Sequence, residues 1–189
     1  MEEKRELWRE NQAGLDVSKL RFLDESSVNA GMTRLYGRAP TNERVNDYVP
    51  DVRFERTSII STLSLNGVEA PMMFKGTLDS DFFAGYVEHI LAPTLSPGEI
   101  VVLDNYSAHK AGDALEPIYE KGATVLFLPE YSPDLNPIEL MWSKVKAILR
   151  KLKPRTAEDL VSAMGQALDS VTLQDIIGWF EHDGYIVNL

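Results

Sequence analysis

The sequence predicts an α/β domain built on a mixed sheet with helices on both faces. Two kinds of segment lead to this fold class. Continuous apolar runs at 100–104 and 124–128 are typical of strands buried on both faces of a parallel sheet. Segments with the apolar spacing of amphipathic helices, such as 79–95 and 137–152, alternate with these runs.

The first half of the chain predicts three strands. A strand at 20–25 is followed by a long excursion or loose hairpin over 31–56, which holds two glycines and two prolines. The β-branched segment 57–65 ends at the pair Asn66-Gly67, a strong signal for a hairpin turn. We therefore expect the segment 70–75 to pair back as the third strand.

Helices and strands alternate in the second half. Gly122 suits the position just after the end of a short helix. Thr156 and Thr172 each begin a capping-box pattern, with aspartate three residues later, so two extra helices are expected at the C-terminal end. The expected order is helix, strand, helix, strand and three helices, at 79–95, 100–104, 111–121, 124–128, 137–152, 156–169 and 172–182.

Composition predicts a globular chain with one domain spanning 1–189, since 44% of its residues are hydrophobic and 25% are charged. The absence of cysteine excludes disulfide frameworks and thiolate metal sites. The first ten residues are too charged for a signal peptide, and no apolar run approaches the roughly 20 residues that cross a bilayer. We expect a cytoplasmic protein with no membrane partner.

The net charge of −10 is unusual for a nucleic-acid enzyme, but basic residues are gathered in two places. Six of them, and no acidic residue, lie in 144–155, and five arginines lie in 34–56. Arginine suits bidentate contacts with phosphate, although a charge run is more often a solvated face. The DNA-binding candidates taken from these groups are Arg34, Arg38, Lys144 and Lys146.

Carboxylates are the residues left to carry chemistry. The sequence has no phosphate loop, dinucleotide fingerprint or serine elbow, and its three histidines lack zinc-ligand spacing. Asp24 lies inside an apolar strand, where an ionised carboxylate is costly unless it is paired or binds a cation. Strand alternation puts Asp24 and Glu25 on opposite faces, so only one of them can point at a given site. Asp104 follows the most hydrophobic strand, where a site residue and a turn or N-cap residue are equally compatible with the pattern.

Glu139 has a competing structural role. Asn136 is a good N-cap, Pro137 suits the first helical position, and Glu139 then falls at the capping-box position of the helix. On spacing alone, capping explains Glu139 better than catalysis does.

Three ordered blocks of the sequence carry a family resemblance, at 22–27, 102–110 and 128–142. They closely resemble the signature blocks of DDE transposases, and the resemblance is greatest to the bacterial insertion-sequence branch of the mariner-like superfamily. The 34 residues between the second and third carboxylates match the interval of that superfamily. The shorter segments 32–40 and 182–185 also look like this branch.

The resemblance implies a ribonuclease H-like fold with five strands, in which Asp24, Asp104 and Glu139 converge on two Mg²⁺ or Mn²⁺ ions. It implies a metal-dependent DNA endonuclease and strand transferase that acts in DNA transposition. One metal would activate the attacking oxygen and the other would neutralise the leaving oxygen. Asp24 is the expected bridging ligand. Further contacts with DNA are expected from His109, Lys110 and Asn136.

The resemblance also implies partners. These are transposon-end and target DNA, with a homodimer in the active complex, which would act at the bacterial nucleoid. Family members of full length carry N-terminal helix-turn-helix domains, for which the chain has no room before Asp24, so a separate DNA-binding subunit is a further expected partner. The alternative functions are another ribonuclease H-like nuclease, such as a resolvase or RNA-strand hydrolase, and an idle remnant that regulates an intact transposase.

Overall fold

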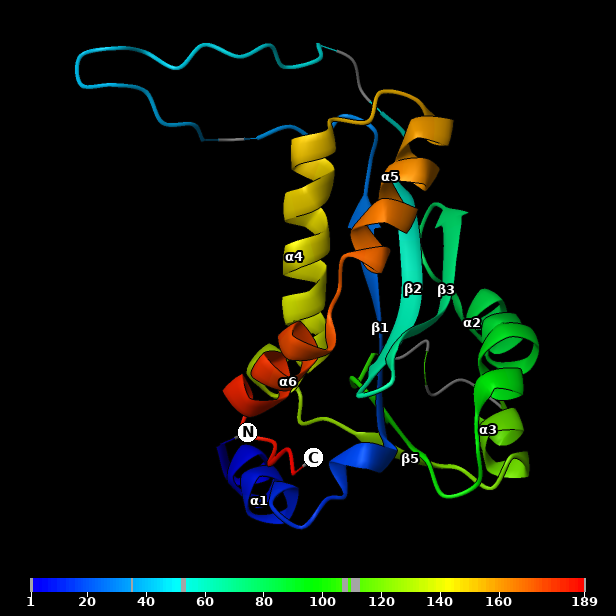
Figure 1. Cartoon of the computed structure of the whole chain (residues 1–189). Coiled ribbons are helices and arrows are strands. Elements are labelled where there is room, and N and C mark those ends of the chain that lie inside the picture. Colours follow the sequence, from blue (N-terminus) through cyan, green and yellow to red (C-terminus); the bar gives the residue numbers. More distant parts are fainter. Residues whose placement is uncertain (1, 35, 52–53, 107–108, 110–112, 189) are drawn as a thin grey trace.

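The computed structural model of the chain describes residues 2–34, 36–51, 54–106, 109 and 113–188, and its centre is a five-stranded mixed sheet (Figure 1). The strand order is β3-β2-β1-β4-β5. The pairs β1–β2 and β2–β3 are antiparallel, and the pairs β1–β4 and β4–β5 are parallel. The mixed sheet and the β2–β3 hairpin confirm the sequence prediction, which did not specify that β1 pairs with β4. The strands are β1 (Leu20–Val28), β2 (Thr57–Ser64), β3 (Gly67–Lys75), β4 (Ile100–Leu103) and β5 (Thr124–Phe127).

Three helices cover one face of the sheet, α4 (Pro137–Leu152), α5 (Ala157–Asp169) and α6 (Leu173–His182) (Figure 1). The ring of Phe22, from β1, packs edge-on against Phe180 and Tyr185, with centroids 5.3 and 5.2 Å away. The even-numbered positions of β1 therefore face this larger core.

Both predicted capping boxes begin these helices. The Thr156 hydroxyl accepts from the backbone N–H of Asp159 at 3.0 Å, and the Thr156 N–H donates to the Asp159 carboxylate at 3.2 Å. Thr172 and Asp175 make the same pair of bonds in α6. No helix in the described part of the chain is long and apolar enough to span a membrane.

The other face is covered by α2 (Ser80–Tyr86) and α3 (Glu116–Glu120). The helix predicted at 79–95 is interrupted, because α2 continues as a π turn over Val87–Leu91 and a 3₁₀ turn over Ala92–Thr94. Pro93 has no N–H and clashes with a carbonyl one turn earlier in a regular α-helix, and these altered turns accommodate it.

Two further predictions about helices need correction. The helix expected at 111–121 is regular only over Glu116–Glu120, where Pro117 lies in the first turn, and residues 111–112 lie outside the described part. No element was expected before residue 20, yet Glu2–Gln12 forms the helix α1 beside the C-terminal segment (Figure 1). Its sequence has little apolar periodicity, and a tertiary contact holds it, since the Gln12 amide donates to the carbonyl of Asp183 at 2.8 Å.

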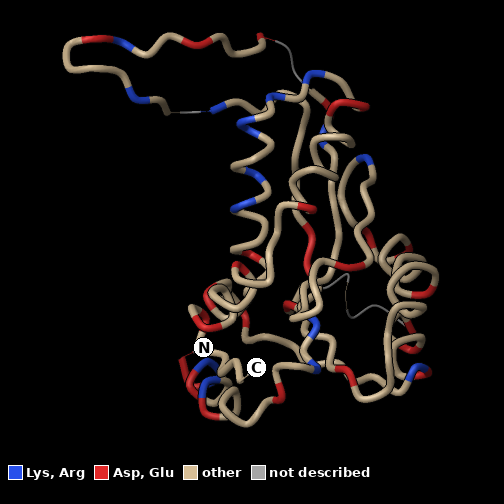
Figure 2. Tube along the Cα trace, viewed as in Figure 1, with Lys and Arg blue, Asp and Glu red and all other residues tan. Residues whose placement is uncertain are grey.

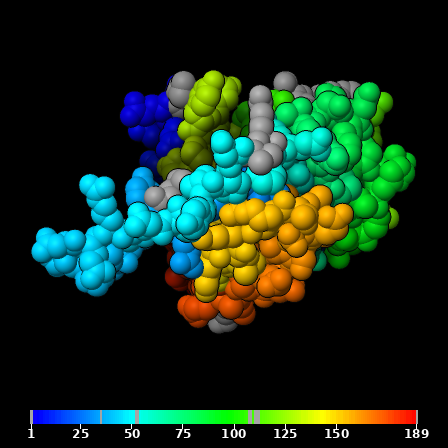
Figure 3. Space-filling view, turned by 90° about the horizontal axis from the view of Figure 1, so that it is seen from above, coloured from blue at the N-terminus to red at the C-terminus, as the bar shows by residue number. Residues whose placement is uncertain are grey.

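The excursion between β1 and β2 is an extended arm, which projects beyond α4 (Figures 1 and 3). It runs out and doubles back as a long excursion, and its described residues form no strand, so the loose hairpin that the sequence also allowed has no β pairing there. The arm has no alternating apolar pattern that would pair two strands. Tyr36 and Tyr48 are 90% and 94% exposed on it, and Asp47 pairs with Lys153 after α4.

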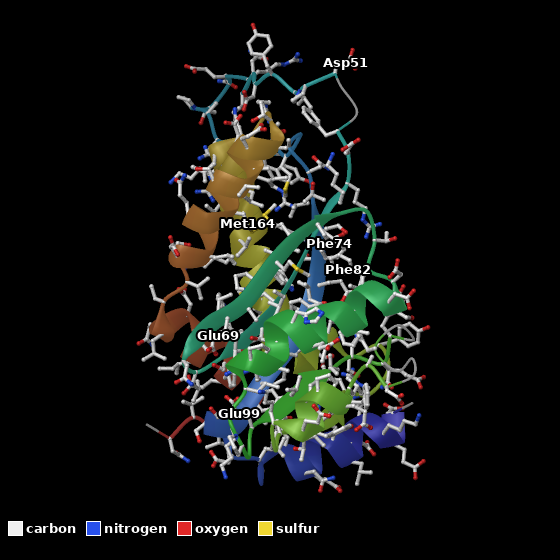
Figure 4. The ribbon with its side chains drawn as sticks, turned by 90° about the vertical axis from the view of Figure 1, so that its right-hand side faces the viewer. Asp51, Glu69, Phe74, Phe82, Glu99 and Met164 are labelled. Carbon is white, nitrogen blue, oxygen red and sulfur yellow. The ribbon has the colours of Figure 1, made fainter. Side chains whose placement is uncertain are left out.

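A buried arginine ties three strands together at the amino end of β1. Arg21 is 2% exposed, and its guanidinium lies 3.2 Å from Glu69 of β3 and 2.8 Å from Glu99, just before β4. The two glutamates are labelled in Figure 4. It also donates to the Thr94 hydroxyl at 2.9 Å. The charge is thus matched on several sides, which a buried ion requires.

We expect Arg21→Met to lower the free energy of unfolding by about 3–5 kcal/mol, because it leaves two carboxylates without their shared cation. Urea denaturation at neutral pH measures this change. Lys75→Met is the matched control, since Lys75 pairs with Glu55 at the exposed surface, and it should change stability little. Equal effects of the two substitutions would contradict the role of the buried cluster.

Candidate active site

A cavity of about 440 Å³ opens where β4 and β5 end. It brings together the three carboxylates singled out in the sequence, Asp24 inside β1, Asp104 directly after β4 and Glu139 in the first turn of α4. The carboxyl ends of parallel strands are where ligands gather in sheets of this kind. The rest of the lining comes from two loops and consists of Asn105, Tyr106, Leu128, Pro129, Glu130, Tyr131, Ser132, Pro133 and Asn136.

The strand register explains why the two aspartates meet. β1 and β4 run parallel with Phe22 opposite Val102, and two residues further along each chain come Asp24 and Asp104. Phe22 and Val102 both belong to the core on the α4 side, so the period of two directs the aspartates to that side as well. α4 packs across β1 on the same face and supplies Glu139.

Asp24 is held in an unfavourable electrostatic environment. It is 8% exposed, and within the described structure its buried Oδ2 atom has no hydrogen-bond partner. Burial raises the pKa of Asp24 well above its usual value, and the negative charges of Glu139, Glu25 and Asp104 raise it further. A bound cation would reverse this repulsion.

Glu139 feels the same field more weakly. Partial burial raises the pKa of Glu139. The positive charge of Lys146, further along α4, opposes this rise, and the negative charge of Asp104 adds to it. The expected capping box does not form, because no side-chain hydrogen bond caps the helix at Asn136. Glu139 lines the cavity instead, so the preference for a capping role based on spacing was wrong.

His109 lies between two carboxylates, those of Asp104 and Glu25. It is completely buried, with Nδ1 2.8 Å from Asp104 Oδ1 and Nε2 3.4 Å from Glu25 Oε2. Its ring packs on Phe83, with centroids 4.5 Å apart. Burial alone would lower the pKa of His109, but Asp104 and Glu25 overcome this and raise it to about 9. The imidazolium form therefore neutralises part of the acidic site.

Glu25 is the residue near the site that the sequence analysis undervalued. Alternation correctly put Asp24 and Glu25 on opposite faces, and only Asp24 lines the cavity. Glu25 nevertheless reaches the same site through His109. The only sequence signal for this was a second carboxylate beside the first, since the partner lies 84 positions away.

The remaining candidates for DNA contact are spread over the molecule. Arg34 and Arg38 are exposed on the arm, and Lys110 lies outside the described residues. Asn136 is 4% exposed at the start of α4 and lines the cavity. The structure thus brings Asn136 to the carboxylates and leaves the two arginines far from them.

The two lysines of α4 differ. Lys144 donates to the Asp175 carboxylate at 2.5 Å and to the Ser170 carbonyl at 2.8 Å, which ties α4 to α6. Lys146 is partly exposed and close enough to Glu139 to affect its pKa.

The donor atoms of the site suit a hard divalent cation, since they are carboxylate oxygens and one of them, on Asp24, is buried and unpartnered. As the side chains stand, however, no three His, Asp or Glu residues of the described part are close enough together to hold a metal ion. The residues fit such an ion by chemistry and placement, and their side chains would have to turn inward to bind it.

Comparisons with known proteins show the family of the chain and its fold. The model of the family described as DDE superfamily endonuclease matches residues 19–161. No curated protein matches the sequence. Solved structures do, among them the "Mos1 transposase paired-end complex with left transposon end", at 14% identity and a TM-score of 0.72, covering 95% of this chain and 56% of that chain. The "mariner Mos1 paired end complex with Mg" matches at 15% identity and a TM-score of 0.74, covering 98% and 62%.

The isolated "catalytic domain of Mos1 mariner transposase" matches at 13% identity and a TM-score of 0.66, covering 98% of this chain and 93% of that chain. The chain therefore spans little more than half the length of the transposase chains in the DNA complexes and nearly all of the catalytic domain. The likeness confirms the predicted ribonuclease H-like fold.

His109 gives the site a testable pH dependence. Its pKa in the folded protein is about 9, above the value of about 6.5 in the unfolded chain, so its stabilising effect is complete below pH 6.5 and is lost as the pH rises towards 9. We expect the free energy of unfolding, measured with chelator present, to fall by about 3 kcal/mol over this range because of His109. His109→Gln should remove this fall. His89→Gln, at an exposed histidine, should retain it, and a fall that persists in His109→Gln would contradict the assignment.

Proposed function

The chain belongs to the DDE superfamily endonucleases, and we propose that it is the catalytic domain of a transposase. Such an enzyme cuts DNA at the ends of a mobile element and joins those ends to target DNA. The observation that carries this proposal is the cavity shared by Asp24, Asp104 and Glu139, which three separate elements direct to one place. Phosphodiester transfer needs charge stabilisation at an attacking and a leaving oxygen, and a carboxylate cluster that binds cations supplies it.

Asp24, Asp104 and Glu139 are the proposed metal ligands. Two Mg²⁺ or Mn²⁺ ions bound there would activate the attacking oxygen and neutralise the leaving oxygen. Both metals occur in the printed names of similar Mos1 complexes. Asp24 is the proposed bridging ligand because it is the most buried of the three and the charges of both Glu139 and Asp104 raise its pKa.

His109 acts on Asp104 in this proposal. Complete burial keeps the imidazole from a phosphate at the surface, and the 2.8 Å contact orients the Asp104 carboxylate instead. Partners of this kind fix the direction of metal-binding groups. Glu25 holds His109 from the other side of the sheet edge.

DNA would follow the exposed side of α4 from the cavity to the arm. Lys146 and Arg150 come seven and eleven residues after Glu139, spacings that keep all three near one face of the helix. Both are partly exposed, and the ion pairs found in the described part of the chain do not include them. Figure 2 shows basic residues along α4 and on the arm, where Arg34 and Arg38 continue the path. Lys144 is the weaker candidate because Asp175 holds it.

The active complex would contain two copies of the chain, since a mobile element has two ends to cut. A helix-turn-helix module, in the same or a separate polypeptide, would recognise those ends. The action on DNA would take place at the nucleoid.

Asp104→Asn should abolish metal-dependent cleavage, with a loss of at least about 100-fold, because it removes a proposed ligand of the metal ions that would stabilise the reacting oxygens. Single-turnover cleavage of a DNA substrate in Mg²⁺ or Mn²⁺ measures this, and thermal unfolding should show that the variant still folds. Asp81→Asn, at an exposed aspartate on α2, is the control and should cut normally.

Full activity of Asp104→Asn, or of the wild-type protein in excess chelator, would sink the mechanism. Cleavage without any joining of DNA ends would favour the hydrolytic ribonuclease H-like nuclease instead of the transposase.

Lys146→Ala and Arg150→Ala should each weaken binding to duplex DNA independently of its sequence. Each should also reduce the slope of log affinity against log salt by about one, because one phosphate contact is lost. Fluorescence anisotropy over a salt series measures both effects. The control is Lys121→Ala, at the end of α3 on the opposite face of the sheet. Equal slopes in all three variants would contradict a DNA contact along α4.

A further inference from the structure

Tyr131 is a large aromatic side chain left out of the core at the edge of the active-site cavity. It lines the cavity together with the three carboxylates, and 85% of it is exposed. Its backbone has φ of 54°, in the left-handed region that a tyrosine rarely adopts. Such strain persists only where surrounding contacts impose it, and it is concentrated at functional sites.

Arg5 of α1 contacts this segment from outside the cavity. Its guanidinium donates to the carbonyl of Tyr131 at 3.4 Å and to the Ser132 hydroxyl at 2.8 Å. It also donates twice to the Asp134 carboxylate, at 2.9 and 2.6 Å. One side chain thus ties Tyr131, Ser132 and Asp134 to α1, through one backbone carbonyl and two side chains. The two-nitrogen contact with the Asp134 carboxylate is a geometry that arginine provides and lysine does not.

Two further contacts fix the ends of the same loop. The Tyr185 hydroxyl donates to the Leu135 carbonyl at 2.8 Å, and the Asn105 amide donates to the carbonyl of Leu128. Pro129 and Pro133 restrict the backbone in between. The loop is therefore held by hydrogen bonds on both sides of an exposed ring.

The surroundings of the ring select what it can bind. The cavity carries Asp24, Asp104, Glu130 and Glu139, so an anionic group is repelled there unless cations are bound. The uncharged face of a nucleobase meets no such repulsion, and stacking on an aromatic side chain tolerates every base. A base paired inside a duplex already has stacking neighbours, so the ring favours one that is unpaired or turned out of the helix.

We propose that Tyr131 is a stacking platform for an unpaired base beside the scissile phosphate and that Arg5 is the positioning residue that presents it. This inference rests on the proposed function, because the base belongs to the DNA substrate. The platform would hold a strand distorted next to the cut, which brings its phosphate to the carboxylates.

The test measures binding without metal and without cleavage. The probes are two DNA duplexes of equal length, one fully paired and one with a single unpaired 2-aminopurine. We expect the wild-type protein to bind the second probe more tightly and to quench its fluorescence. Tyr131→Ala and Tyr131→Leu should weaken binding of that probe by about tenfold and abolish the quenching, with affinity for the paired duplex unchanged. Tyr131→Phe should behave as wild type, and so should the control Tyr119→Ala, at an exposed tyrosine of α3.

Arg5 is tested with the same probes. Arg5→Ala should lose most of the preference for the unpaired base, and Arg5→Lys should recover part of it, since an ammonium keeps the charge near Asp134 but not the two-nitrogen contact. Hydrogen exchange of residues 130–136 should speed up in Arg5→Ala. Glu10→Ala, on the exposed side of α1, is the control for changes in the helix itself.

Equal binding of the unpaired-base probe by wild type, Tyr131→Ala and Tyr131→Leu would overturn the stacking role, even in a protein that cuts DNA. A preference that survives Arg5→Ala would overturn the positioning role of Arg5. Absence of cleavage by the wild-type protein in Mg²⁺ would count against the proposed function alone, because the stacking measurement requires no cleavage.

Discussion

The parallel pairing of β1 with β4 is the constraint on which the site depends. Its register places Asp24 beside Asp104 on the face that α4 covers. A slip of one residue in β1 would turn Asp24 to the opposite face and bring Glu25 in its place, and it would also expose the apolar partners of Phe22. The energy of core packing therefore holds the two aspartates of the candidate site in place, although no carboxylate contributes to that packing.

The same register gathers negative charge where folding alone would avoid it. Asp24 is buried with an unpartnered oxygen, and the neighbouring carboxylates raise its pKa. His109 offsets part of this repulsion because it contacts both Asp104 and Glu25. A bound cation would relieve the remaining imbalance of charge, and natural proteins accept such costs at functional sites.

Contacts between distant parts of the chain complete the walls of the site. α1 reaches across to the loop after β5 through Arg5 and Asp134, and Tyr185 near the C-terminal end holds the same loop. The two ends of the chain lie together on this side of the molecule (Figure 1). Arg5 and Tyr185, which hold this loop, thus lie outside the three sequence blocks that contain Asp24, Asp104 and Glu139.

The sequence by itself determined most of the fold. Apolar runs marked β4 and β5, the Asn66-Gly67 turn marked the hairpin, and threonine caps marked α5 and α6, because each of these signals lies within a few neighbouring residues. The motif blocks supplied the resemblance that joined Asp24 and Asp104 to Glu139. Residue patterns alone favoured capping for the last of these.

Only the tertiary structure decided which chemical role each local pattern serves. It placed Glu139 in the cavity without a capping bond, buried His109 between two carboxylates and formed α1 from a segment with little periodicity. Arg5 and Asp134 are separated by 129 positions, so no local pattern records their contact. Periodicity reports how a segment faces the core, whereas a site depends on which segments meet, and packing of the whole chain determines that.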